Sequence, residues 1–502
     1  MPLLSSRERA FLQTVSLISY ANPFLPELVA LERQALGEDF SEEEPIWSLR
    51  VADPDRPRAN SWKIADRTHA LAGQLRERLR RNPRASRSDL ELYEDGLLFW
   101  LYHRFHDRLR QASPGRCPFY SDFLREWDVY FRVPGAELPT GHTPAHTFAC
   151  FYQIVRAFHH IFEHIIGNSL PAARLRAAVW QSIFTHDMRR YRRTLFDRMG
   201  DFATLITGPS GTGKELVARA IALSRHLPFD EKRMAFEENP SGWFFPINIP
   251  ALSSTLVESE LFGHRRGAFT GAVQDKRGWL EVCPPLGSVF LDEIGDLDPS
   301  IQVKLLRVIE TRTFHAVGET AGRRFHGKLI AATNRNLSQA ISQGRFREDL
   351  YYRLCSDLIV APSLSQQIRE SPGVLRDLVL FMARRVAGPD AFSLAAEAEE
   401  WIAHNLGLDY AWPGNYRELE QCVRNLLIRK DYRPAHPSGG EPGGDWLAAA
   451  RDGSLTASEL LTRYCTLVYA QTGSYEEAAR RLGLDRRTVK SKIDLPLLAR
   501  LR

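Results

Sequence analysis

Long apolar runs and closely spaced cysteines are both missing from this chain of 502 residues. No apolar run approaches the ~18 residues that a membrane-spanning helix requires, so we expect no membrane partner. The six cysteines stand at least 33 residues apart (117 to 150), which excludes a CxxC zinc motif and a dense disulfide framework. This cysteine usage predicts a reducing, cytoplasmic environment.

A large excess of one charge is missing as well. The net charge of +5 is too small over this length to indicate a polyanionic partner by itself. Hydrophobic residues make up 44% and charged residues 25%, which indicates a globular protein with room for about three domains. A mildly apolar stretch at 11–21 is interrupted by polar residues and lacks a small-residue cleavage site, so we predict an amphipathic helix there rather than a signal peptide.

The expected fold class changes along the chain. Residues 1–165 carry apolar positions at helical spacing among many arginines, which predicts a helical N-terminal region. Short β-rich runs then alternate with helical patterns, which predicts parallel strands with helical crossovers. These runs lie at 204–207, 289–291 and 329–332.

The last third of the chain is again helical. A helical stretch covers 374–427, and the proline- and glycine-rich run at 434–445 predicts a flexible linker before a final helical module. The predicted domains are a helical N-terminal region, an α/β ATPase core, a helical lid, a linker and a C-terminal helical module. Their bounds are 1–165, 166–360, 361–432, 433–446 and 447–502.

A phosphate-binding loop is predicted at 208–214, where the sequence GPSGTGK follows a strand and precedes a helix-forming run. Its backbone N–H groups and the start of the new helix can surround phosphate oxygens, while Lys214 supplies a positive charge. Glu215 stands where many such loops have a serine or threonine on magnesium. The predicted ATP-binding residues here are Gly208, Pro209, Ser210, Gly211, Thr212, Gly213, Lys214 and Glu215.

Two carboxylates end a second strand, 78 residues after Lys214 (292 − 214). Asp292 is predicted to hold hydrated Mg²⁺, and Glu293 is predicted to polarise the attacking water. A third strand ends at Thr333 and Asn334, where a polar side chain can report the γ-phosphate. For Asp292 and Glu293 taken alone, the alternative is a charged strand end that faces solvent.

A glycine-flanked loop at 267–272 has an apolar side chain with no evident role in phosphate chemistry. Such a side chain on a mobile loop usually contacts a partner. The loop, preceded by the sequence ESELFGH at 258–264, strongly resembles that of the bacterial enhancer-binding proteins, the sigma-54-dependent AAA+ activators. The resemblance implies that it engages sigma-54 through Gly267, Ala268, Phe269, Thr270, Gly271 and Ala272.

The resemblance covers about 166–430 and implies further roles. Asn248 is similar to the asparagine that pairs with Glu293 and couples the nucleotide state to the loop. Arg347 and Arg353 are similar to the arginine fingers that reach a neighbouring subunit's ATP in a ring, and Arg417 to the lid arginine on the phosphates. The implied partners are sigma-54 RNA polymerase, an upstream double-stranded DNA enhancer site and other copies of the chain, as dimers or a hexameric ring.

The sequence departs from the family pattern at several places. Pro209 replaces a frequent glutamate, and Tyr416 replaces the usual valine. Residues 226–242 resemble an insertion, and residues 363–373 replace a proline- and arginine-rich turn. None of these changes removes a catalytic group, although the last is expected to alter lid motion.

The C-terminal module at 474–490 is predicted to contain two short helices joined at Gly483, similar to a Fis-type helix-turn-helix. The second helix would face DNA with basic and polar side chains. These are Arg486, Arg487, Thr488 and Lys490. A helical hairpin with a solvated basic face is the alternative.

The signal that the N-terminal region senses cannot be read from its sequence. A phosphate-accepting receiver domain would have an acidic pair after a β-strand, and this region lacks that pattern, so we do not predict control by phosphorylation. His159, His160, Glu163 and His164 have a spacing that permits metal binding, but a partly exposed linker helix is the preferred interpretation. An aromatic cluster is predicted to be core rather than a ligand pocket. It comprises Tyr93, Phe99, Trp100, Tyr102 and Phe105.

The predicted function is ATP-driven activation of sigma-54 transcription. One alternative is an AAA+ remodeller of another protein, which would not need Phe269 and Thr270. Another is a DNA-binding repressor without turnover, which would not need Glu293 or Arg347.

Overall fold

A computed structural model describes residues 3–42, 59–112, 115–139, 141–236, 242–371, 373–407, 409–434, 455–494 and 497–498. The chain divides into two compact units, each considered by itself. The first comprises Met1–Glu399 with Gly414–Arg424, and the second Glu400–Pro413 with Asn425–Arg502. The predicted divisions at 165/166 and 360/361 both fall inside the first unit and remain predictions.

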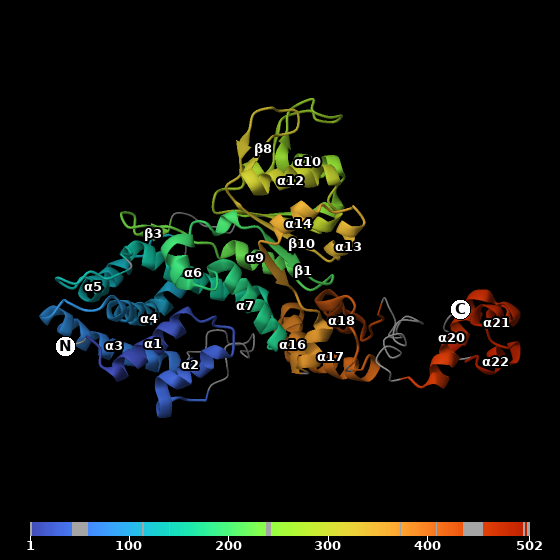
Figure 1. The fold of residues 1–502 in the computed structure, drawn as a ribbon, viewed down its shortest axis with the longest axis horizontal. Helices are drawn as coiled ribbons and strands as arrows, with labels where there is room; N and C mark the ends of the chain where they lie inside the picture. The colour runs from blue at the N-terminus through green and yellow to red at the C-terminus, as the bar shows by residue number, and fades with distance from the viewer. Residues whose placement is uncertain are drawn as a thin grey trace. The chain divides into compact units, whose positions relative to one another are not determined.

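The N-terminal region is helical, as predicted, and lies against the ATPase core in Figure 1. Its apolar side chains form one continuous core, in which Leu97, Leu101 and Phe123 have no exposed surface. Its helices are α1 (Ser6–Tyr20), α2 (Glu27–Leu36), η1 (Gly37–Asp39), α3 (Ala59–Arg81), α4 (Arg87–Gln111), α5 (Tyr120–Phe131) and α6 (Pro144–His164).

A five-stranded parallel sheet forms the centre of the ATPase core, in the order β11-β1-β10-β7-β4. The predicted strand at 204–207 is confirmed, and the predicted runs at 289–291 and 329–332 lie inside longer strands. The strands are β1 (Thr204–Thr207), β4 (Phe244–Asn248), β7 (Ser288–Asp292), β10 (Lys328–Thr333) and β11 (Asp357–Val360).

The two faces of this sheet are covered by different helices, because successive strand residues point to opposite sides. Ile206, Phe290 and Ile330 pack with α7 (Leu170–Phe184) and α9 (Lys214–Leu223). Leu205, Leu291 and Leu329 pack with the opposite set of helices. That set is α10 (Ser254–Phe262), α12 (Pro299–Thr311), α13 (Leu337–Ser342) and α14 (Glu348–Leu354).

The ATPase core also contains short connecting elements and two short hairpins. The hairpins pair β5 (Gly263–His264) with β6 (Lys276–Arg277), and β8 (Thr313–Phe314) with β9 (Arg323–Arg324). The connecting elements are α8 (Met188–Arg190), η3 (Tyr191–Leu195), η4 (Met199–Asp201), η6 (Ile249–Ala251), α11 (Trp279–Val282) and η7 (Ile294–Asp296).

The predicted insertion at 226–242 fastens the N-terminal helices to the core. It contains the antiparallel pair β2 (Phe229–Asp230) and β3 (Ala235–Phe236). Phe229 and Phe236 belong to the N-terminal hydrophobic core, with their ring centroids 4.8 and 5.8 Å from that of Phe148. The Tyr120 hydroxyl donates a hydrogen bond of 2.5 Å to Glu231.

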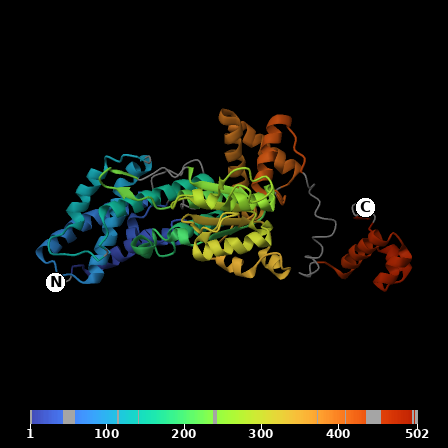
Figure 2. The same ribbon diagram turned by 90° about the horizontal axis from the view of Figure 1, so that it is seen from above.

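Helix α6 makes a second attachment at the end of α9. The Gln153 side chain donates to the Ser224 carbonyl at 2.9 Å, and Arg156 donates to the Arg225 carbonyl at 3.0 Å. The same adjacency of the N-terminal helices, coloured blue to teal, and the core is visible in Figure 2. The N-terminal region is therefore packed on the ATPase core rather than joined to it by a tether alone.

The lid and the C-terminal module are helical, as predicted. The lid elements are α15 (Leu364–Glu370), α16 (Gly373–Ala387), η8 (Gly388–Asp390), α17 (Ala391–Asn405) and α18 (Asn415–Arg429), and the module has α20 (Ala457–Thr472), α21 (Tyr475–Leu482) and α22 (Arg486–Ser491). The predicted linker at 434–445 lies almost entirely outside the described residues. Among the described helices, none combines the length and apolar character needed to cross a membrane.

Candidate nucleotide site and partner-contacting loop

The phosphate-binding loop lies between the end of β1 and the start of α9 and has the backbone that its glycines predict. Gly208, Gly211 and Gly213 have φ angles of +151°, +76° and +83°, which other residues rarely adopt. A Cβ atom on Gly208 would lie 2.6 Å from the Ala361 carbonyl oxygen. The loop therefore requires glycine both for its conformation and for its close approach to Ala361, which directly follows β11, a neighbour of β1 in the sheet.

Lys214 is buried in this loop and points its ammonium group at carbonyl oxygens. Its Nζ donates to the carbonyls of Gly208 at 3.0 Å and Pro209 at 3.2 Å. Burial lowers the pKa of Lys214, while Glu293 and Asp292 act in the opposite direction. The two carbonyl oxygens stand in for the phosphate oxygens that the ammonium group would meet, so the loop fits a nucleotide.

Asp292 and Glu293 lie at the carboxyl end of β7, beside this loop. Burial, followed by the charge of Glu293, raises the pKa of Asp292, which makes it a site that a bound cation would stabilise in its charged form. Glu293 has φ 55° and ψ 50°, a left-handed conformation that is strained for glutamate. Strained backbone of this kind is typical of functional positions.

The Glu293 carboxylate accepts a hydrogen bond of 3.0 Å from the backbone N–H of Asn334, at the end of β10. Among the described residues, no hydrogen bond joins it to Asn248. Instead, the pairing of β4 with β7 places Asn248 opposite Asp292. The structure thus brings Asp292, Glu293 and Asn334 to one edge of the sheet. The pairing of Asn248 with Glu293, which the resemblance implies, remains a prediction.

Glu215 has a different setting from the neighbouring Lys214. Its side chain is half exposed and lies 3.4 Å from Arg219, one helical turn along α9. Glu215 also raises the pKa of Asp292 slightly, as a minor cause after burial. A role for Glu215 in nucleotide binding remains a prediction.

The lid contacts the phosphate loop through Asn415, a residue that the sequence analysis did not select. Its side-chain amide donates to the Ser210 carbonyl at 2.8 Å, and its carbonyl oxygen accepts from the Leu364 N–H at 2.8 Å. The backbone N–H of Tyr416 donates to the Gly211 carbonyl at 3.1 Å. Arg417 is exposed beside them, and its charge is one of the groups that lower the pKa of Lys214. Asn415 lies two positions before Arg417, in the same lid segment that resembles the family, so this segment could have indicated that Asn415 contacts the nucleotide site.

The two departures from the family pattern in the lid contact one another. The Gln367 side chain donates a hydrogen bond of 2.5 Å to the Tyr416 hydroxyl and accepts one of 3.1 Å from Ser169. Burial raises the pKa of Tyr416 to about 12, so the hydroxyl stays neutral. The altered turn and the tyrosine therefore form one polar link between Ser169, at the start of α7, and the lid.

Arg347 and Arg353 are both exposed at α14, as arginine fingers acting on another subunit require. Arg347 pairs with Asp349 at 2.7 Å, and Arg353 with Glu310 at 3.1 Å. The buried Gln302 fixes this turn, because its side chain accepts from the Arg347 N–H at 2.9 Å and donates to the Arg345 carbonyl at 3.0 Å. Gln302 had no distinguishing sequence signal within its helix.

The loop at 267–272 lies between β5 and β6 and is closed by its own backbone. Gly267 and Gly271 have φ angles of +81° and +99°, and the Gly267 N–H donates to the Ala272 carbonyl at 2.9 Å. Phe269 is partly buried against His264, with ring centroids 4.9 Å apart, while Thr270 is exposed. The loop thus holds Phe269 near its base and presents Thr270 outward.

A second loop, between β8 and β9, braces the first. The Arg265 N–H donates to the Val317 carbonyl at 3.0 Å, and the Arg265 side chain pairs with Asp275 at 2.7 Å and also with Glu319. A Cβ on Gly318 would lie 2.9 Å from the Cβ of Ala268. Movement of either loop therefore displaces the other.

The C-terminal module has the two short helices that the sequence predicts, joined at Gly483 with φ +63°. Val468 of α20 completes their core with Ala478, Ala479 and Val489. Arg486 pairs with Glu476 at 2.9 Å, whereas Arg487 and Lys490 are exposed and Thr488 is partly buried. DNA contact by these residues remains a prediction.

Two predictions for the N-terminal region can be compared with the structure. His159, His160 and Glu163 lie together at the end of α6, where His159 and Glu163 are exposed, which agrees with a partly exposed helix. Of the aromatic cluster, Tyr93, Trp100 and Phe105 are buried core residues, as expected. Phe99 belongs to the same core and Tyr102 packs against it, and both also line a cavity.

Comparison with known proteins agrees with this geometry. Residues 185–359 match the family described as the sigma-54 interaction domain. The chain is 38% identical over 299 residues to the transcriptional regulatory protein ZraR of Klebsiella oxytoca, covering 58% of this chain and 63% of that protein. It is 35% identical over 343 residues to the DNA-binding transcriptional regulator NtrC of Azospirillum brasilense, covering 61% and 67%. The chain belongs to the sigma-54-dependent AAA+ activators.

The likeness to relatives in this family is partial in length. A Nif-specific regulatory protein of Enterobacter agglomerans is 34% identical over 309 residues, covering 59% of this chain and 55% of that protein. Among solved structures, NtrX of Brucella abortus in complex with ADP has a TM-score of 0.40 and 22% identity, covering 79% of this chain and 85% of that one.

Proposed function

We propose that this chain is an ATP-hydrolysing activator of sigma-54 transcription. The observation that supports the proposal is that one compact unit contains both a phosphate-binding loop with two carboxylates near it and a braced loop with an exposed threonine. The nucleotide site comprises Lys214, Asp292 and Glu293, and the loop presents Thr270. A general remodeller would need the first of these but not the second.

The residues around the site have separable roles in this proposal. Lys214 and the loop N–H groups bind the phosphates of ATP, and Glu293 orients and polarises the attacking water. Mg²⁺ held by Asp292 would neutralise charge on the phosphates. The Glu293–Asn334 hydrogen bond joins two strand ends, so a shift of the carboxylate toward water would alter this contact.

The testing experiment is transcription from a sigma-54 promoter with purified protein and polymerase, in the presence of ATP or a non-hydrolysable analogue. Open complexes should form with ATP alone. Equal activity with the analogue would contradict coupling to hydrolysis. ATP turnover without any open complexes would favour the remodeller of another protein.

We also propose a ring assembly and DNA binding by the C-terminal module. Mixed rings of Arg347→Ala and Lys214→Ala subunits should regain part of the ATPase activity, since one subunit supplies the site and the other the finger. Removal of 447–502 should abolish sequence-specific DNA binding in a gel shift and leave ATP hydrolysis intact. An unchanged gel shift would contradict the DNA-binding assignment.

A further inference from the structure

Three metal-ligating side chains meet where the N-terminal helices join the ATPase core. His146 and Cys150 lie one turn apart on α6, and His226 follows α9 at the start of the insertion. Their ligand atoms all lie within 4.8 Å of one another. The His146 Nε2 and Cys150 Sγ atoms are 3.6 Å apart, close to the ~3.5 Å edge of a tetrahedral zinc site built from Zn–S and Zn–N bonds.

The cluster is buried and its hydrogen bonding is incomplete. Cys150 and His226 are only 4% and 7% exposed. The Nε2 atoms of His226 and of the nearby His142 are both buried without a hydrogen-bond partner. The His142 and His146 rings lie 5.3 Å apart, and His142 lies outside the group of three. Buried polar atoms of this kind cost free energy unless something binds them.

The donor atoms suit a metal ion, since zinc binds neutral imidazole nitrogens and deprotonated thiols. Metal binding would release the Cys150 thiol proton to solvent as the thiolate–metal bond forms.

We propose that His146, Cys150 and His226 bind Zn²⁺, with water in the fourth position. Imidazole nitrogens and a thiolate form a donor set that zinc accepts in tetrahedral geometry. Binding would replace one contact of the metal-free structure, a hydrogen bond of 2.7 Å between His146 Nε2 and the Arg192 carbonyl. The ion would tie α6 to the chain after α9, and the Arg192 carbonyl in η3 would lose its contact with His146.

The position indicates what the ion would do. Helix α9 begins at Lys214 and ends at Leu223, where Gln153 and Arg156 of α6 already donate to carbonyls of the next residues. Zinc at the cluster would reinforce the same joint between the N-terminal region and the ATPase core. Loss of zinc should therefore loosen this joint without removing any group from the nucleotide site.

The test measures metal content directly. The full-length protein, stripped with a chelator and then supplied with zinc sulfate, should retain one Zn²⁺ per chain after desalting. Cys150→Ser and His226→Gln should each weaken zinc binding at least tenfold. Cys117→Ser is the matched control, since Cys117 is a buried thiol of the same region outside the cluster and should leave zinc binding unchanged.

Cobalt binding to the wild-type protein gives a second readout, which does not depend on whether the Cys150 and His226 variants fold. Wild-type protein loaded with Co²⁺ should show a thiolate-to-cobalt absorption band, and Cys117→Ser should keep it. Bound cobalt without this band would contradict ligation by Cys150. Less than one tenth of an equivalent of zinc in the wild type, or full zinc retention in Cys150→Ser, would overturn the proposal. These outcomes are separate from the ATPase and transcription assays.

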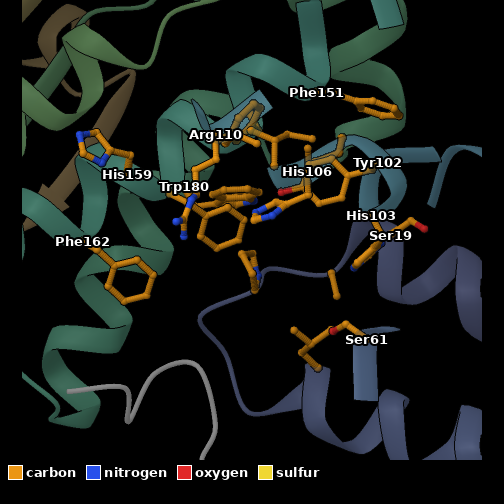
Figure 3. Close-up of a pocket in the computed structure, with 18 of the residues that line it drawn as sticks. Ser19, Ser61, Tyr102, His103, His106, Arg110, Phe151, His159, Phe162 and Trp180 are labelled. Atoms are coloured by element: carbon orange, nitrogen blue, oxygen red, sulfur yellow. The ribbon is translucent and has the colours of Figure 1, made fainter. Parts of the chain in front are cut away.

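A separate observation concerns a cavity of about 960 Å³ among α1, α4, α6 and α7, within the range of small-molecule sites. Figure 3 shows aromatic and histidine side chains around it, including Tyr102, Phe162 and Trp180. Acidic and basic side chains both line the cavity in similar number, so neither charge dominates; they are Glu32, Asp107, Glu163, Arg110, Arg192, Arg219 and Arg385. The cavity therefore favours an uncharged, ring-bearing molecule.

This cavity reaches the ATPase machinery. Leu216 and Arg219 of α9, within two turns of Lys214, contribute to its lining, as do Phe381 and Arg385 of the lid helix α16. A molecule in the cavity would contact the N-terminal helices, the helix behind the phosphate loop and the lid at once. We infer that the cavity is an effector site for a neutral aromatic molecule, an inference that rests on the proposed function for its regulatory meaning.

Two dyes with the same ring framework test this charge preference. N-phenyl-1-naphthylamine is neutral, whereas 1-anilinonaphthalene-8-sulfonate carries a sulfonate. The neutral dye should bind saturably, one per chain, and at least tenfold more tightly than the sulfonate. Ser19→Trp, which adds bulk at the lining, should weaken its binding at least tenfold, while Leu17→Trp on the exposed face of α1 should not. Equal binding of both dyes, no saturable binding, or unchanged binding in Ser19→Trp would overturn the inference, whatever the transcription assay shows.

Discussion

The nucleotide site and the attachment of the N-terminal region to the ATPase core are built in different ways. The nucleotide site takes its groups from the ends of neighbouring strands, so a few residues at fixed chain spacings determine it. The N-terminal helices are held by side chains far apart in sequence, such as Phe148 on α6 and Phe229 in the insertion, with ring centroids 4.8 Å apart. A single substitution in the nucleotide site should therefore abolish ATP hydrolysis, whereas a single substitution among the packing residues should only weaken the attachment of the N-terminal helices.

The largest effect is expected at Glu293. Glu293→Gln should bind ATP normally but lower kcat by about 10²–10⁴-fold, since the amide cannot act as a general base toward water. ATP binding and steady-state hydrolysis would be measured on the same preparation. The same change at the exposed Glu370 serves as the control and should leave both within a few-fold. Normal turnover in Glu293→Gln would remove the water-activating role.

A graded effect is expected where the insertion meets the N-terminal core. Phe229→Ala should destabilise this attachment by about 3–5 kcal/mol, because it removes a buried aromatic ring. Thermal unfolding and limited proteolysis would detect earlier release of the N-terminal helices, with the nucleotide site still able to bind ATP. Lys232→Ala, on the exposed turn of the same hairpin, should change neither. Loss of ATP binding together with the attachment would show that the two regions are not separable.

The smallest effect is expected at the polar link in the lid. Tyr416→Phe leaves the Gln367 amide without its acceptor and should cost about 1–2 kcal/mol of stability. Exposed Tyr352→Phe is the matched control and should be neutral within about 0.5 kcal/mol. Unfolding midpoints in denaturant would distinguish them. An equal stability of the two variants would show that the hydrogen bond contributes nothing.

The same comparison explains what could be predicted from the sequence. The strand at 204–207, the loop at 208–214 and the carboxylates after β7 are local patterns whose chemistry restricts both residue type and spacing, and the structure places them together. Gln302 acts through hydrogen bonds with the backbone of a distant turn, which no spacing in the chain encodes. The role of the insertion and the meeting of His146, Cys150 and His226 likewise depend on packing between segments about 75 residues apart (226 − 150 = 76).

The central claim is that the loop carrying Thr270 transmits ATP hydrolysis to sigma-54. ATP can shift the polymerase only through contacts that differ between nucleotide states, and this loop is the proposed contact. The most direct measurement compares ATP hydrolysis and open-complex formation for Thr270→Ala and the wild type on single preparations, with sigma-54 binding followed in a transition-state nucleotide analogue. The variant should hydrolyse ATP within a few-fold of wild type, lose sigma-54 binding and form no open complexes. Full promoter opening by Thr270→Ala would contradict the account and favour remodelling of a different target.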